Sequence, residues 1–248
     1  MKTFALMAVM MLTWLSSGCA SGDTGDAGCE ARRKAMVETQ IRARGISDRR
    51  VLAAMLKTPR HEFVPENVRS RAYDDGPLPI GYGQTISQPY IVALMTQAVR
   101  VKPGDRALEI GTGSGYQAAV LSELCEEVYT IEIIPRLGRR AEKDLKRLGY
   151  DNVHVIIGDG FLGLPEKAPF DVIVVTAAPP DIPEPLLEQL ADGGRLVIPV
   201  GEDYPQKLVL AGKMNGKITR RVITEVLFVP LTGENVEKMK KKADGNKN

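Results

Sequence analysis

The stretch EIGTGSGY, residues 109–116, follows a short apolar segment and leads into a helical pattern. Its glycines allow a sharp turn and let the backbone approach a ligand without an intervening Cβ. Many such turns contain glycine only because it allows close packing, so the turn by itself is weak evidence of a ligand. Glu132, however, stands 21 residues after Gly111, where a carboxylate meets a ribose diol in nucleotide-binding folds. Together they favour a nucleoside site over a surface glutamate that merely ends a strand.

The spacing of the glycines bears on which nucleoside binds. The dinucleotide fingerprint GxGxxG needs a glycine where Tyr116 stands, whereas the order here is GxGxG. A pyrophosphate at the helix N-terminus is therefore less expected than a ligand without phosphates, such as S-adenosylmethionine. Asp159, within GDG at residues 158–160, could accept from an adenine amino group or could simply form an Asx-turn. These features favour a methyltransferase over an NAD-dependent dehydrogenase.

Outward from the turn, apolar segments alternate with helical patterns. We expect strands at residues 106–110, 128–132, 153–157, 171–176 and 194–200, helices at residues 89–99, 116–124, 135–148 and 184–190, and a hairpin from residues 207–211 and 222–229. Such alternation implies crossover connections. The predicted fold class is therefore α/β: a Rossmann-like S-adenosylmethionine-dependent methyltransferase fold, with a mostly parallel doubly wound sheet, a C-terminal antiparallel hairpin and N-terminal helices.

Five segments are expected along the 248 residues. They are a lipoprotein-type signal at 1–18, a flexible tether at 19–30, N-terminal helices with a substrate loop at 31–100, an S-adenosylmethionine-binding α/β core at 101–232 in the same domain, and a charged, solvated tail at 233–248. The signal is inferred from an apolar run of twelve residues before Cys19, which is too short to span a bilayer. The alternative is a start codon placed too early, with Met36 as the true start.

Composition excludes several classes of protein. The formal net charge of +2 gives no sign of a nucleic-acid-binding surface. Two histidines, and three cysteines without a CxxC pair, predict no metal site. The P-loop motif GxxxxGKS or GxxxxGKT is absent from the sequence, which excludes a P-loop nucleotidase. We expect a monomer with no nucleic-acid partner, touching a membrane only through a lipid anchor at Cys19.

The stretch QTISQPY, residues 84–90, runs into a predicted helix with Ser87 at the N-cap and Pro89 in the first turn. A plain helix cap would account for this pattern. The same geometry also suits a carboxylate, because a helix N-terminus presents free N–H groups and a partial positive charge. A carboxylate acceptor is already ionised at neutral pH and needs no general base.

Seven stretches resemble the protein-L-isoaspartate O-methyltransferase family, from about residue 30 to residue 230. They are RHEFVP (60–65), PLPIG (77–81), QTISQPY (84–90), EIGTGSGYQAAVL (109–121), GDG (158–160), PFDVIVVTAAP (169–179) and QLADGGRLVIPVG (189–201). The resemblance implies methyl transfer from S-adenosyl-L-methionine to the free α-carboxylate of L-isoaspartyl residues in damaged proteins and peptides. The methyl ester then closes to a succinimide, which begins repair.

The resemblance also implies a set of site residues. The active-site serine falls on Ser87, with Thr85, Ile86 and Gln88 beside it around the substrate carboxylate. The expected cofactor-binding residues are Glu109, Gly111, Thr112, Gly113, Ser114, Gly115, Glu132, Asp159, Gly160 and Thr176. No metal is implied.

The N-terminal signal departs from the family, which is ordinarily cytoplasmic. Because the methyl donor is made in the cytoplasm, an exported enzyme would lack it. Location therefore stays open between the cytoplasm and an envelope lipoprotein. Two other functions also stay open: a methyltransferase with another acceptor, such as a small molecule or RNA, and a non-catalytic envelope binding module.

Overall fold

The computed structural model describes residues 26–245; the predicted signal segment, the anchor at Cys19 and residues 19–25 of the tether lie outside the described residues. The strands are β1 Leu78–Gly81, β2 Gln84–Ile86, β3 Arg106–Ile110, β4 Glu127–Glu132, β5 Val153–Ile157, β6 Phe170–Val175, β7 Leu190–Val200, β8 Gln206–Met214 and β9 Lys217–Val226. The α-helices are α1 Asp26–Ala35, α2 Arg49–Lys57, α3 Pro89–Val99, α4 Tyr116–Ser122, α5 Pro135–Arg147, α6 Glu184–Glu188 and α7 Glu234–Gly245. Short π- and 3₁₀-helical turns join them, at Met36–Ile41, Arg42–Arg44, Arg60–Phe63, Glu66–Arg71, Gly160–Leu162 and Pro165–Lys167.

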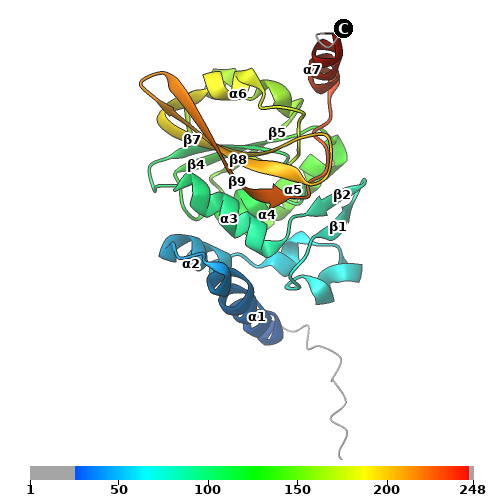
Figure 1. Ribbon diagram of the computed structural model, residues 1–248. Coiled ribbons are helices and arrows are strands. Elements are labelled where there is room, and N and C mark those ends of the chain that lie inside the picture. Colours follow the sequence, from blue (N-terminus) through cyan, green and yellow to red (C-terminus); the bar gives the residue numbers. More distant parts are fainter. Residues whose placement is uncertain (1–25, 246–248) are drawn as a thin grey trace, which may run out of the picture.

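A seven-stranded sheet runs through the centre in the order β5-β4-β3-β6-β7-β8-β9 (Figure 1). Neighbours from β5 to β7 are parallel, and β8 and β9 add an antiparallel hairpin. The chain moves outward from β3 through β4 to β5 and then returns to β6 on the other side of β3. Ligands of open α/β sheets bind outside the carboxyl ends of the strands at such a reversal. The predicted fold class is confirmed.

Both faces of the central strands are buried, and their side chains alternate between two hydrophobic clusters. Ala107 and Val172 belong to the cluster that contains residues of α2, α3 and α4. Their chain neighbours Leu108 and Ile173 belong to the cluster that contains residues of α6. Strands covered on both faces in this way are typical of parallel sheets with helical crossovers.

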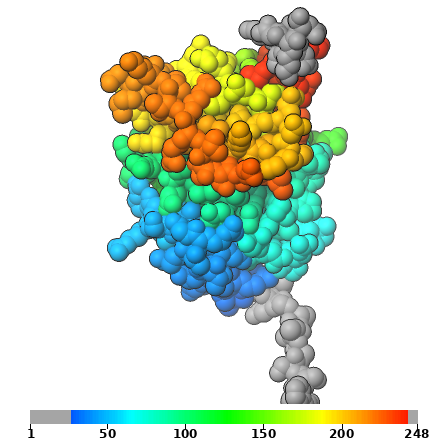
Figure 2. Space-filling view, in the orientation of Figure 1, coloured from blue at the N-terminus to red at the C-terminus, as the bar shows by residue number. Residues whose placement is uncertain are grey.

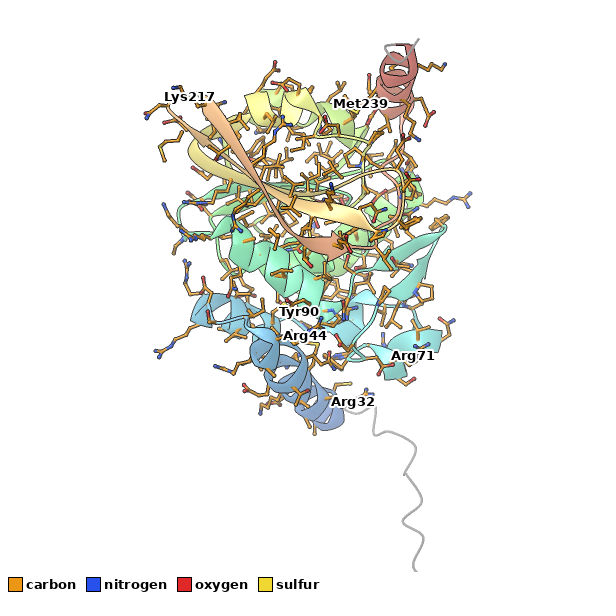
Figure 3. The ribbon with its side chains drawn as sticks, in the orientation of Figure 1. Arg32, Arg44, Arg71, Tyr90, Lys217 and Met239 are labelled. Atoms are coloured by element: carbon orange, nitrogen blue, oxygen red, sulfur yellow. The ribbon has the colours of Figure 1, made fainter. Side chains whose placement is uncertain are left out.

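The N-terminal segment packs against the sheet region and forms a continuous surface with it (Figure 2). Gly45, at a φ of +92°, ends the first helical run, and the Asp48 carboxylate caps α2 by accepting from the Arg50 N–H. The Arg44 guanidinium lies 3.7 Å from the centre of the Tyr90 ring, which joins this segment to α3 (Figure 3). That residues 31–100 share a domain with the core stays a prediction.

Both ends of the described chain are more ordered than the sequence predicts. Helix α1 begins at Asp26, within the predicted tether, and Cys29 on it is 1% exposed. Helix α7 occupies most of the predicted solvated tail, and its Val236 is fully buried. The prediction that residues from 233 onward are a solvated fringe was therefore wrong at its start, because Val236 supplies an apolar anchor among charged neighbours.

Strand boundaries differ from the expected ones mainly at the far edge of the sheet. β7 starts at Leu190 rather than residue 194, and β9 runs from Lys217 to Val226 rather than over 222–229. Most of β9 is exposed, so its residues carry little apolar signal. Asn215 and Gly216 both have positive φ at the hairpin turn, as the two central residues of a type I′ turn do. Within residues 26–245, no helix is both long and apolar enough to cross a membrane.

Candidate active site

A hollow that is partly open to solvent lies at the carboxyl ends of β3, β4 and β6. Three walls enclose it: the glycine turn after β3, the β1–β2 hairpin, and the chain between β9 and α7. The lining residues are Gln84, Thr85, Ile86, Ser87, Val92, Glu109, Ile110, Gly111, Thr112, Gly113, Ser114, Tyr116, Gln117, Ile131, Glu132, Ile133, Ile134, Gly160, Thr176, Ala177, Val229, Pro230, Leu231 and Thr232.

The glycine turn is locked by its neighbours. Gly111 has a φ of +95°, and a Cβ added there would lie 2.5 Å from Thr176 Oγ1. That hydroxyl donates to the Gly111 carbonyl at 2.6 Å and lies 3.0 Å from the Ile110 carbonyl. Only glycine fits this position, because both the backbone conformation and the space exclude a side chain.

Glu132 holds the turn from the side of β4. Its Oε2 accepts from the Gly113 N–H at 2.8 Å, and its Oε1 accepts from the Ile134 N–H at 2.9 Å. The residue is 5% exposed and lines the pocket. A carboxylate has about four acceptor sites, so Glu132 can still accept from a hydroxyl pair on a ligand.

Glu109 places a second acid in the pocket wall. It is fully buried, and its Oε2 accepts from the Thr130 hydroxyl at 2.6 Å. Burial raises the pKa of this carboxyl to about 8, the Thr130 hydrogen bond lowers it, and the nearby Glu132 adds to the rise. Among the described residues, Glu109 Oε1 has no hydrogen-bond partner. A buried acceptor left unpaired is costly, so a cationic ligand group at this position would be stabilised.

The opposite wall comes from the β1–β2 hairpin. Pro79 pairs with Thr85, and Leu78 pairs with Ile86, whose side chain is buried. Ser87 follows directly and is half-buried beside the pocket. The N-cap of α3 is Gln88 rather than Ser87, because Pro89, which lacks an N–H, takes the first helical position. The predicted capping role of Ser87 is therefore wrong, which leaves its hydroxyl available to a ligand.

Two further contacts support this wall from behind. The buried Arg60 donates from Nε to the Ala72 carbonyl at 2.8 Å and lies 4.9 Å from the centre of the Tyr116 ring. Burial lowers the pKa of Arg60 to about 10, so the guanidinium stays charged at neutral pH. Gln88 donates from Nε2 to Asp75 Oδ1 at 2.6 Å. The Gln88 bond ties the chain before β1 to the start of α3, and the Arg60–Tyr116 contact joins the chain before β1 to α4.

Comparison with known proteins gives a consistent result. Residues 31–236 match the model of the family described as protein-L-isoaspartate(D-aspartate) O-methyltransferase (PCMT). The chain belongs to this family. Among the relatives, the protein-L-isoaspartate O-methyltransferase of Opitutus terrae is 60% identical over 203 residues, covering 82% of this chain and 87% of its own. That of Methanoculleus marisnigri is 55% identical over 206 residues, covering 83% and 94%.

Solved structures of the same family agree. A protein-L-isoaspartate O-methyltransferase structure superposes with a TM-score of 0.77 at 32% identity, covering 84% of this chain and 69% of that chain. A structure from Plasmodium falciparum, assigned to the same activity and in complex with S-adenosyl-L-homocysteine, has a TM-score of 0.72 at 31% identity, covering 81% and 98%. The family resemblance read from the sequence is confirmed.

Most of the predicted site residues line one pocket. They are Thr85, Ile86, Ser87, Glu109, Gly111, Thr112, Gly113, Ser114, Glu132, Gly160 and Thr176. Three predicted residues lie outside the lining. Gln88 turns to Asp75, while Gly115 packs on α5, where an added Cβ would lie 3.1 Å from Leu145.

Asp159 is the third residue outside the lining. Its Oδ1 accepts from the Phe161 N–H, which is the Asx-turn alternative, and its Oδ2 accepts from Asn235 Nδ2 on α7 at 2.8 Å. The structure thus supports the local structural role for Asp159. A contact with an adenine amino group stays a prediction.

The chain from Val229 to Thr232 was missed by the sequence reasoning, although all four residues line the pocket. This segment pairs with the chain after β6, where the Leu231 N–H donates to the Ala178 carbonyl at 2.8 Å. Among the described lining residues there is no His, Cys, Lys or Arg.

Proposed function

We propose that this chain transfers the methyl group of S-adenosyl-L-methionine to the free α-carboxylate of L-isoaspartyl residues in damaged proteins and peptides. The resulting ester closes to a succinimide, which begins repair. One observation carries the proposal beyond family membership. The glycine turn with Glu109 and Glu132 and the run from Thr85 to Ser87 line a single pocket.

The described residues fit the methyl donor. The unpaired Glu109 Oε1 suits the ammonium group of the amino-acid moiety, and the free acceptor sites of Glu132 suit the ribose diol. Thr112 and Ser114 supply hydroxyls in the same turn. When bound, S-adenosylmethionine supplies an electrophilic methyl group. A bound cation would also lower the pKa of the buried Glu109 carboxyl and favour its ionised form.

The acceptor needs no proton transfer. An α-carboxyl group with a pKa of about 3.5 is ionised at neutral pH, which agrees with a pocket lining that offers no His or Lys as base. Ser87 holds the carboxylate by its hydroxyl and does not act as a nucleophile. Thr85 and Ile86 frame the same group. Because an anion and a cation meet and their charges cancel, exclusion of bulk water and alignment of the reactants supply the acceleration.

The test is transfer of labelled methyl to a matched pair of peptides. One carries an L-isoaspartyl residue and its twin carries a normal aspartyl residue. We expect label on the isoaspartyl peptide only, and base-labile release of methanol from the product. Equal labelling of both peptides, or labelling of neither while a small molecule or RNA is methylated, would overturn the proposed acceptor.

We propose a cytoplasmic location, because the methyl donor is made there and the family is ordinarily found there. The alternative, an envelope lipoprotein cleaved before Cys19, rests on the N-terminal signal. Cell fractionation with N-terminal sequencing tests this point separately from activity. A lipid-modified Cys19 in the membrane fraction would overturn the cytoplasmic proposal.

A further inference from the structure

The tip of the β1–β2 hairpin holds an aromatic side chain in an unusual backbone conformation. Gly81, Tyr82 and Gly83 all have positive φ, at 95°, 55° and 70°. A bulky residue with positive φ is uncommon, because its Cβ crowds the neighbouring carbonyl. The Tyr82 side chain is also 53% exposed. Burial in the core therefore does not explain why an aromatic residue stands here.

The hairpin carries Tyr82 to the rim of the active site. β2 begins two residues after Tyr82 and leads through Thr85 and Ile86 to Ser87, all in the pocket wall. Gly81 pairs with Gln84, so Tyr82 and Gly83 form the turn itself. Three residues span at most about 11 Å, so Tyr82 lies within that distance of Thr85. A substrate polypeptide whose isoaspartyl side group enters the pocket must cross this rim. Its residues two or three positions away from the isoaspartyl residue then lie level with Tyr82.

The chemistry of the rim is apolar. The segment from 77 to 87 contains no charged residue. A polypeptide crossing the hairpin rim therefore meets an exposed aromatic ring on a segment without charges. Such a surface favours apolar and aromatic side chains on the partner.

We propose that Tyr82 is a specificity-determining residue, which packs its exposed ring on an apolar or aromatic side chain two or three positions from the isoaspartyl residue. This inference rests on the proposed function and adds a preference for the sequence around the damaged residue. The flanking glycines hold the turn in the conformation that presents the ring. Ser87 and its neighbours hold the carboxylate, so the contact at Tyr82 acts on peptide binding and not on the methyl transfer itself.

The test compares two substitutions and two peptides. Tyr82→Asn removes the ring and keeps a residue that tolerates positive φ, while Tyr82→Phe keeps the ring and removes only the hydroxyl. One isoaspartyl peptide carries Phe at two and three positions on each side, and the other carries Gly there. We expect Tyr82→Asn to raise KM for the Phe peptide about 3- to 10-fold. Its kcat, its KM for the Gly peptide and its calorimetric affinity for S-adenosylmethionine should stay unchanged, and Tyr82→Phe should behave as wild type.

The outcomes separate this inference from the proposed function. If wild type methylates the peptides and Tyr82→Asn leaves both KM values unchanged, or raises both equally, the inference is wrong while the proposed function stands. If wild type methylates neither peptide, both are wrong.

Discussion

The two sides of the pocket are built differently. On the donor side, the glycine turn is fixed by Thr176, by Glu132 Oε2 and by the Thr112–Thr130–Glu109 chain of buried hydrogen bonds. On the acceptor side, the β1–β2 hairpin has two short strands outside the main sheet, and its tip is exposed. The methyl donor is the same molecule in every reaction, so a rigid and complementary wall can bind it. Acceptors carried on many different damaged proteins need only a fixed place for the carboxylate and an open approach.

The largest expected effect comes from replacing one glycine on each side of the pocket with alanine. Gly111→Ala forces positive φ on alanine and brings its Cβ against Thr176. Gly83→Ala, at the hairpin tip, meets the same kind of backbone penalty but has nothing within 4 Å. We expect Gly111→Ala to lower the free energy of unfolding by more than about 2 kcal/mol and to abolish binding of S-adenosylmethionine, and Gly83→Ala to cost about 1 kcal/mol. Urea unfolding of both variants checks this; equal losses would contradict the proposed difference in rigidity.

Glu132→Ala should have the next largest effect, and only on the donor side. The change removes an acceptor for the ribose and releases the N–H groups of Gly113 and Ile134. We expect affinity for S-adenosylmethionine to fall by about 1.5–3 kcal/mol, the usual value of hydrogen bonds to a charged group. Isothermal titration calorimetry gives this value directly. Unchanged affinity would remove Glu132 from the donor site.

Ser87→Ala should produce the reverse pattern. The variant loses the hydroxyl proposed to hold the acceptor carboxylate, while the donor wall stays as it is. We expect kcat/KM for an isoaspartyl peptide to fall about 10- to 100-fold, with no change in S-adenosylmethionine affinity. Initial rates and calorimetry on the same preparation separate the two effects. Wild-type turnover in this variant would count against the role given to Ser87.

A separate effect is expected in the pH dependence of stability. Burial raises the pKa of Glu109 to about 8, above its ordinary value of 4.5. Between these values the unfolded chain has released this proton while the folded chain keeps it, so Glu109 lowers the stability of the ligand-free protein as pH rises from about 5 to 8. Glu109→Gln has no such proton. We expect its free energy of unfolding to fall less over this range than that of wild type, in urea titrations at several pH values, and parallel profiles would refute the assignment.

The sequence predicts the donor side better than the acceptor side, for physical reasons. β3, β5 and α3 lie where their apolar patterns place them, at Arg106–Ile110, Val153–Ile157 and Pro89–Val99. Strands buried on both faces leave a strong pattern, and a glycine turn with an acid after the next strand follows from local geometry. The exposed β9 leaves a weak pattern, and its start was misplaced.

Tertiary contacts account for what the sequence did not reveal. From the sequence, Asp159 could equally bind a ligand or form an Asx-turn. The hydrogen bond from Asn235, near the other end of the chain, favours the structural role. The pocket wall at Val229–Thr232 was hidden for the same reason, since its partner Ala178 lies some fifty residues earlier. The N-cap of α3 could not be assigned from the sequence, because it depends on Pro89 taking the first helical position.

The return of Val229–Thr232 to the pocket also bears on the protein's synthesis. Its four residues are among the last of the family match, which ends at residue 236. A ribosome must therefore have translated past residue 232, and the exit tunnel must have released these residues, before this pocket can form completely. A prematurely terminated product would keep most of the sheet and lack one side of the pocket.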